Sequence, residues 1–158
     1  MKPLDLLPES ACAEAREWAA QQTGTPKQAW NSCPRGDWLL WLAHYFGVER
    51  RLLVLSASDC AASVVDLVKP ESLLASVWAI DSARRFARGE TDVEECRAAA
   101  DAAYAAAAAA ACAAYTTADA YTTAADAARK KKHAECARLV RKHIPWAVIE
   151  AAIAKGTP

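Results

Sequence analysis

The segment WLLWLAHYF, residues 38–46, decides the fold class of this chain of 158 residues. Wound as a helix, it carries apolar side chains on nearly every face, which is typical of a helix in the middle of a bundle. Asp37 stands directly before it as a candidate N-cap, and Gly47 follows it where a left-handed glycine commonly ends a helix. We therefore predict a buried central helix between these two residues.

Helix signals continue on both sides of this segment. Thr25-Pro26 provides a candidate N-cap followed by proline at the first helical position, and residues 91–94, Thr-Asp-Val-Glu, have the spacing of a capping box. Gly24, the Lys69-Pro70 pair and Gly89 are the predicted stops. Together these signals predict further helices at about residues 8–22, 25–30, 48–68, 71–89, 91 onward and 144–155.

Alanine dominates the stretch between Thr91 and His143, and alanine is the best helix former. A stretch of that length in a compact domain suggests a break. The Tyr-Thr-Thr sequence at residues 115–117 is the predicted place, because threonine is β-branched and a fair N-cap. We expect an antiparallel helical hairpin here, with one long helix over residues 91–143 as the alternative.

No strand pattern competes with these helices, and the chain has the length of one domain. The predicted fold is all-α. We expect a single-domain helical bundle over residues 1–158, of about six to eight helices with a long Ala-rich helical hairpin.

The composition narrows the function classes. The chain has 19 basic and 19 acidic side chains, so its net charge steers it neither towards nucleic acid nor towards an anionic membrane. Its first ten residues lack the apolar core of a signal peptide, and its six cysteines include no CxxC pair. We expect a cytoplasmic protein with reduced thiols, no membrane span, no bound metal and no cofactor.

Four charged residues form the first candidate site: Asp59, Asp81, Arg84 and Arg88. Arg84 ends a helical stripe that starts with Leu73 and Val77, so it stands where an apolar residue is expected. The turn at residues 69–70 folds two helices antiparallel and brings Asp59 to the level of Arg84. Two interpretations stay open, a contact point for an anionic group and a structural ion-pair cluster, and the structural one is favoured.

A strongly basic run lies near the C-terminal end of the chain: Arg129, Lys130, Lys131, Lys132, Arg138, Arg141 and Lys142. Such a run binds phosphates in nucleic-acid-binding proteins and is equally typical of a solvated helix face near a helix C-terminus. No aromatic residues suited to base stacking alternate with these cations, which weakens the nucleic-acid interpretation.

No residue pattern predicts catalysis. His133 begins an H-x-E sequence like that of zinc deaminases, but the P-C-x-x-C sequence of that class is absent. A metal shared by His133 and Cys136 lacks two further ligands, so a solvated histidine and a packed cysteine are favoured. The chain also has no Gly-rich phosphate loop, H-E-x-x-H or G-x-S-x-G. We therefore expect no catalytic residues and no enzyme activity.

Six tryptophans are many for this length: Trp18, Trp30, Trp38, Trp41, Trp78 and Trp146. We expect most of them in the core, because each buries a large apolar area. An exposed one would mark an interaction surface.

Two blocks of the sequence resemble a known family. The first is AIDSARRFARGE, residues 79–90, followed by an Ala-rich helix from Val93; the second is WNSCPRGDWLLW, residues 30–41, together with the ending Ile-Pro-Trp at residues 144–146. They are similar to the immunity-protein family encoded beside bacterial polymorphic toxins, including members in phage genomes. Asp81 and Phe86 stand where that family is expected to have Glu and Trp.

The resemblance implies an all-α protein that neutralises a protein partner and has no catalytic residues. The leading hypothesis is a non-enzymatic protein-binding inhibitor, acting in toxin immunity or in phage counter-defence such as an anti-CRISPR, whose target is a toxin or a host defence protein. The alternative is a binder of a small anionic ligand or nucleotide at Asp81, Arg84 and Arg88. A second alternative is nucleic-acid binding through the basic helix from Arg129 to Lys142.

Overall fold

The computed structural model describes residues 2–65, 70–98 and 123–156. Within these ranges every regular element is helical, which confirms the predicted all-α fold. The elements are the 3-10 helix η1 (Pro3–Leu6) and the α-helices α1 (Ala13–Ala20), α2 (Pro26–Ser32), α3 (Gly36–Tyr45), α4 (Arg50–Ala62), α5 (Pro70–Arg88), α7 (Thr123–His143) and α8 (Trp146–Ala154). Residues 93–98 are helical as well.

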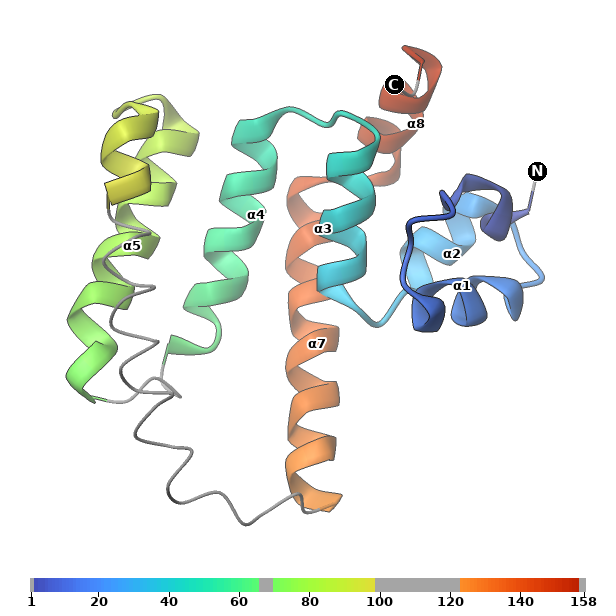
Figure 1. The fold of residues 1–158 in the computed structure, drawn as a ribbon, viewed down its shortest axis with the longest axis horizontal. Helices are drawn as coiled ribbons and strands as arrows, with labels where there is room; N and C mark the ends of the chain where they lie inside the picture. The colour runs from blue at the N-terminus through green and yellow to red at the C-terminus, as the bar shows by residue number, and fades with distance from the viewer. Residues whose placement is uncertain (1, 66–69, 99–122, 157–158) are drawn as a thin grey trace.

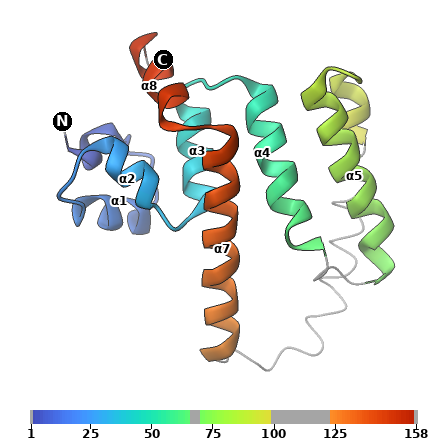
Figure 2. The same cartoon turned by 180° about the vertical axis from the view of Figure 1, so that it is seen from behind.

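Helices α3, α4 and α7 lie side by side at the centre of the molecule (Figure 1). Helix α4 runs opposite to the other two, and α5 packs on its far side. Helices η1, α1 and α2 lie at the other end, beyond α3, and α8 follows the upper end of α7. Seen from behind, α7 lies in front of α3, so the central helices form two layers (Figure 2).

The apolar core lies where α3, α7 and α8 meet. Its largest fully buried side chains include Val140, Ile144 and Ile149, and Leu39 of α3 packs in the same cluster. Burying one aliphatic side chain of this size stabilises a fold by about 1.5–3 kcal/mol. The predicted central helix is therefore α3, although its Trp41 is 39 % exposed because this side chain borders a cavity.

Two predicted stops end their helices with a left-handed glycine. Gly47 has a φ of 71° and Gly89 a φ of 78°, which a residue without a Cβ adopts freely. In both cases the glycine N–H and the following N–H bond back to carbonyls of the last turn at 2.9–3.0 Å. This double closure is the Schellman motif, so both stops are confirmed.

One predicted helix start is confirmed. The hydroxyl of Thr25 accepts a hydrogen bond from the Gln28 backbone N–H at 3.3 Å, and the Gln28 side-chain oxygen accepts one from the Thr25 N–H at 2.8 Å. This reciprocal pair fixes the start of α2.

Three other predicted starts are wrong. Helix α3 begins at Gly36 with Arg35 at the N-cap, and the Asp37 carboxylate binds the Arg35 guanidinium at 2.6 and 2.9 Å instead of capping. The helix after Gly89 is capped by Asp92, whose carboxylate accepts the Glu95 N–H at 2.9 Å; a carboxylate is a stronger acceptor than the threonine hydroxyl before it. Helix α1 begins at residue 13, since residues 8–12 form a turn.

Gly36 lets the start of α3 touch α7 closely. A Cβ atom at this position would lie 2.7 Å from the Cys136 Cβ and 2.8 Å from the Ala137 backbone nitrogen. Both distances are shorter than van der Waals contact, so a larger residue here forces the two helices apart.

Helices α4 and α5 pack on each other through small residues. Four serines are buried in the two helices: Ser56, Ser58, Ser72 and Ser82. Four of the larger apolar side chains of α5 are exposed, including Leu73 and Val77, so the first half of the predicted stripe does not face α4. Ile80 and Phe86, further along the helix, are half-buried. The reason is that serine and alanine on one face let α5 approach α4 closely, which turns the opposite face, with its leucine, valine and tryptophan, to solvent.

The predicted Ala-rich hairpin is described in part, by residues 93–98 and by α7. Its predicted break at residues 115–117 lies outside the described residues. Among the helices that the structure describes, none is both long enough and apolar enough to cross a bilayer.

Candidate functional site

Asp59 of α4 is the centre of the charged cluster that the sequence indicates. Its Oδ1 accepts hydrogen bonds from Arg84 Nε and Nη2 at 3.0 and 2.6 Å, and its Oδ2 lies 2.8 Å from Nε2 of His143. Burial acts to raise the pKa of Asp59, but the hydrogen bonds from Arg84 and His143 outweigh burial and hold this pKa below its usual value. The ionised carboxylate therefore joins three helices, α4, α5 and α7.

Two residues of the predicted cluster lie elsewhere. Asp81 is exposed, and Arg88 donates from Nη2 to Glu90 Oε2 at 2.8 Å at the exposed end of α5. Their positions on the helix lie further towards solvent than that of Arg84. His143 takes their place, and no sequence pattern links it to Asp59, because 84 residues separate the two.

The predicted basic run divides into structural and exposed cations. Lys132 Nζ donates to the Ser63 carbonyl at 2.7 Å, and Arg141 Nη1 donates to the Cys33 carbonyl at 2.8 Å. These carbonyls belong to the C-caps of α4 and α2, where a cation complements the negative end of the helix dipole. Lys132 and Arg141 therefore stabilise neighbouring helices.

The other cations of the run face solvent. Lys131, Arg138 and Lys142 follow one another at i, i+7 and i+11 on the exposed side of α7, and Lys130 is exposed beside them. The side chain of Arg129 lies outside the described residues. The exposed basic stripe on α7 therefore contains fewer cations than the run predicted from the sequence.

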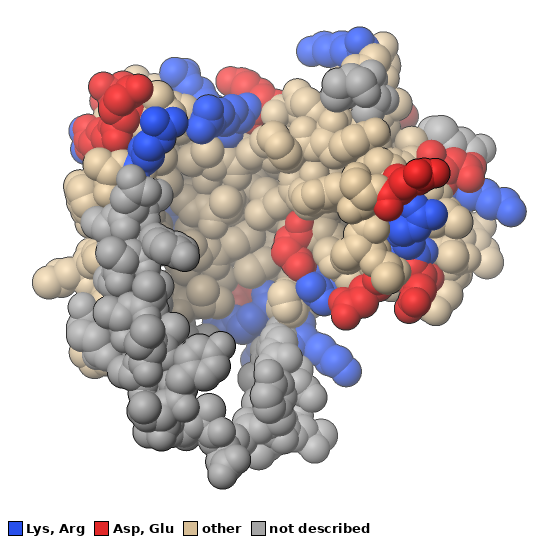
Figure 3. Space-filling view, viewed as in Figure 1, with Lys and Arg blue, Asp and Glu red and all other residues tan. Residues whose placement is uncertain are grey.

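Most of the large apolar side chains that are exposed among the described residues lie on α5, and we call these the α5 face: Leu73, Leu74, Val77 and Trp78. Leu74 is 84 % exposed and Trp78 is 46 % exposed. Charged side chains of both signs gather at the C-terminal end of α5 and the turn after it (Figure 3). An apolar centre with charged groups at its edge is the usual composition of a protein-binding surface.

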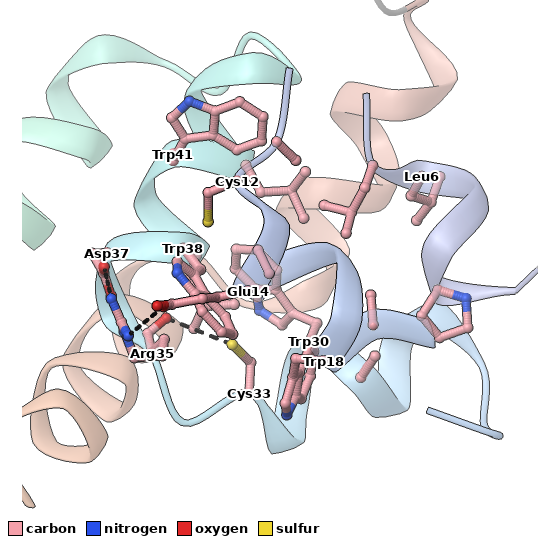
Figure 4. Close-up of a pocket in the computed structure, with 18 of the residues that line it drawn as sticks. Leu6, Cys12, Glu14, Trp18, Trp30, Cys33, Arg35, Asp37, Trp38 and Trp41 are labelled. Atoms are coloured by element: carbon pink, nitrogen blue, oxygen red, sulfur yellow. Dashed lines mark hydrogen bonds and ion pairs between the residues drawn. The ribbon is translucent and has the colours of Figure 1, made fainter. Parts of the chain in front are cut away.

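A cavity of about 740 Å³ lies between η1, α1, α2 and α3. Five of the six tryptophans line it, and we call it the tryptophan pocket: Trp18, Trp30, Trp38, Trp41 and Trp146. Trp30 belongs to the buried core, and Trp18, Trp38 and Trp146 pack against it, in line with the expectation that most tryptophans lie in the core. Figure 4 shows Trp18, Trp30, Trp38 and Trp41 around the pocket. Trp18 and Trp38 face each other with ring centroids 6.2 Å apart.

The thiol of Cys60 and the imidazole of His133 both have partners among the described residues. The Cys60 thiol donates to the Cys136 carbonyl at 3.6 Å between α4 and α7. Burial, followed by the neighbouring Cys136, raises the pKa of Cys60 to about 12, which keeps this thiol protonated at neutral pH. His133 Nδ1 lies 3.6 Å from Asp37 Oδ1, and the described residues include no group of three ligands suited to a metal ion.

Comparison of the chain with protein-family models, with curated proteins and with solved structures finds no match.

Proposed function

We propose that this protein is a non-enzymatic inhibitor that binds a protein target through the α5 face. The observation that carries the proposal is the orientation of α5. This helix packs on α4; its Ser72 and Ser82 are buried, whereas its Leu74 and Trp78 are exposed. Exposing large apolar side chains while burying small polar ones does not stabilise a monomer, whereas a bound partner would remove the exposed apolar side chains from water.

The composition of the α5 face fits a protein partner better than a small molecule. Tryptophan is enriched among the residues that contribute most to protein–protein binding, and its neighbours here are aliphatic. The salt bridges Arg85–Glu95 and Arg88–Glu90 lie at the C-terminal end of α5, beyond the α5 face. A partner with an apolar groove and polar edges matches this pattern.

The class of target follows from the sequence blocks at residues 79–90 and 30–41. The first block includes the last ten residues of α5, residues 79–88, next to the α5 face. Its resemblance to immunity proteins of polymorphic toxins supports a toxin or a host defence protein as the target, met in the cytoplasm.

The two alternatives receive less support from the geometry. An anionic ligand at Arg84 must compete with Asp59, which already holds two of its nitrogens. Nucleic-acid binding has a specific observation in its favour, the exposed basic stripe of Lys131, Arg138 and Lys142 on α7. It predicts binding that falls steeply with salt.

The experiment compares three immobilised forms of the full chain in lysate of the source host: wild type, Leu74→Glu and Ala151→Glu. The last is the matched control, because Ala151 is exposed on α8, at a distance from α5, and gains the same charge (Figure 1). Proteins retained at both low and high salt are identified by mass spectrometry, purified and titrated against each form by calorimetry.

We expect one purified target to bind wild type and Ala151→Glu equally and to bind Leu74→Glu at least about ten-fold more weakly, as for a central interface residue. Equal binding of the target to all three forms would place its site away from α5. Retention of nucleic acid alone, lost at high salt, would favour the basic stripe instead.

A further inference from the structure

The tryptophan pocket is built by parts of the chain that are distant in sequence. Trp18 comes from α1, Trp30 from α2, Trp38 and Trp41 from α3, and Trp146 from α8. Its volume of about 740 Å³ falls within the range of small-molecule sites, roughly 300–1,000 Å³. Small-molecule sites are typically concave and lined by apolar and aromatic side chains with few polar groups, which is the composition of this pocket.

The charged residues of the pocket satisfy one another. Arg35 donates to the Asp37 carboxylate at 2.6 and 2.9 Å and lies 3.6 Å from the Glu14 carboxylate. Its guanidinium also stacks 4.7 Å above the Trp38 ring. In Figure 4 this group lies together on one side of the pocket, with Leu6 on the other side. The pocket therefore offers no free cation to an anionic ligand, and a neutral ligand is favoured.

One polar group of the pocket wall has no partner. Trp30 is only 3 % exposed, and its indole N–H is buried without a hydrogen-bond partner among the described groups. A buried donor left unsatisfied is costly, and indole is a donor only. A ligand with an acceptor atom satisfies it once the side chains that cover Nε1 shift to let that atom approach.

We propose that the tryptophan pocket binds a neutral, planar aromatic molecule that carries a hydrogen-bond acceptor for Trp30. Ring faces and edges of the surrounding indoles provide stacked and edge-to-face contacts for such a molecule. This site is separate from the α5 face, because none of the four residues of that face lines the pocket. Ligand binding in the tryptophan pocket therefore does not depend on the protein-binding function proposed for the α5 face.

The test uses three probes and ligand-observed NMR titration of the full chain. The first, 2-acetylnaphthalene, is neutral, aromatic and has a carbonyl acceptor; 2-ethylnaphthalene has the same rings without an acceptor; decanoate is an aliphatic anion. The variants are Trp30→Phe, which keeps a ring but removes the donor, and Trp41→Ala, which removes a partly exposed wall. Trp78→Ala, on α5, is the control.

We expect saturable binding of 2-acetylnaphthalene to wild type and to Trp78→Ala. Trp30→Phe should weaken that probe about five-fold and leave 2-ethylnaphthalene unchanged, which is the effect of one hydrogen bond. Trp41→Ala should weaken both naphthalenes, and it tests the site even where Trp30→Phe does not fold.

Three results would overturn the proposal. The first is no saturable binding of either naphthalene to folded wild type. The second is tighter binding of decanoate than of 2-acetylnaphthalene, which points to an aliphatic anion. The third is a wild-type dimer in sedimentation that Trp41→Ala dissociates, which assigns the pocket to a second copy of the chain.

Discussion

Two helix contacts in this molecule use side chains in opposite ways. Around α7, large aliphatic residues such as Ile144 and Val140 are fully buried. Between α4 and α5, the buried residues include serines, while Leu74 and Trp78 of α5 face solvent. The first contact resembles the interior of an ordinary domain. The second leaves large apolar side chains of α5 exposed among the described residues, which is the observation behind the proposed protein-binding surface.

The largest expected change in unfolding free energy distinguishes the core around α7 from the contact between α4 and α5. Ile144→Ala removes atoms from the α7 core and should lower the free energy of unfolding by about 4 kcal/mol, through lost burial and a new cavity. Leu74→Ala removes atoms from a side chain that is 84 % exposed and should change it by less than about 0.5 kcal/mol. Urea unfolding followed by circular dichroism measures both. Similar losses would mean that the α5 face is packed in solution.

A second substitution tests how closely the core helices approach. Gly36→Ala places a Cβ within 2.8 Å of α7 backbone atoms and should cost about 3 kcal/mol in urea unfolding, since backbone yields less than a side chain. The control, Gly47→Ala, meets no atom within 4 Å and should cost only the strain of its left-handed backbone, about 1 kcal/mol. Equal costs would show that the α3–α7 contact is loose.

The Asp59 carboxylate ties the two contacts together, and its charge should matter to stability. Asp59→Asn leaves Arg84 and His143 without their anion and should cost about 2 kcal/mol at pH 5. The folded pKa of Asp59 is lowered, so its contribution is present above the unfolded pKa and is lost as pH falls through the folded pKa.

The difference in unfolding free energy between wild type and Asp59→Asn should therefore shrink as the pH falls from 5 to 3, because aspartate in the unfolded chain, with a pKa of about 3.9, becomes protonated in this range. Acid-dependent chemical unfolding of both proteins measures it. A difference that stays constant over this range, or grows, would contradict the assignment of Asp59 as the ionised centre of the cluster.

The smallest effect concerns the serines between α4 and α5. The Ser82 hydroxyl is fully buried and has no hydrogen-bond partner among the described groups, whereas the Ser56 hydroxyl donates to the Leu52 carbonyl at 2.7 Å. Ser82→Ala should stabilise the protein by up to about 1 kcal/mol, because it removes an unsatisfied polar group. Ser56→Ala should be less favourable. Thermal unfolding compares the two, and the reverse order would mean that Ser82 has a partner in solution.

The sequence predicted the helical fold and several boundaries correctly, because those depend on neighbours along the chain. Alanine content, the Thr25 capping box and the glycines at positions 47 and 89 act within one or two helical turns. The errors at Asp37 and Thr91 were also local. The Arg35 guanidinium binds the Asp37 carboxylate that was expected to cap α3, and Asp92 accepts the Glu95 N–H, one residue beyond the predicted capping box.

The candidate sites were decided by tertiary structure. The sequence indicated that Asp59 and Arg84 lie at one level, because a short turn joins their helices, but His143 joins them only through the packing of α7. Likewise, no pattern along the chain shows that α5 faces outwards or that five tryptophans surround one space. Helix formation is governed by backbone hydrogen bonds over a few residues, whereas burial and charge pairing depend on which distant surfaces meet.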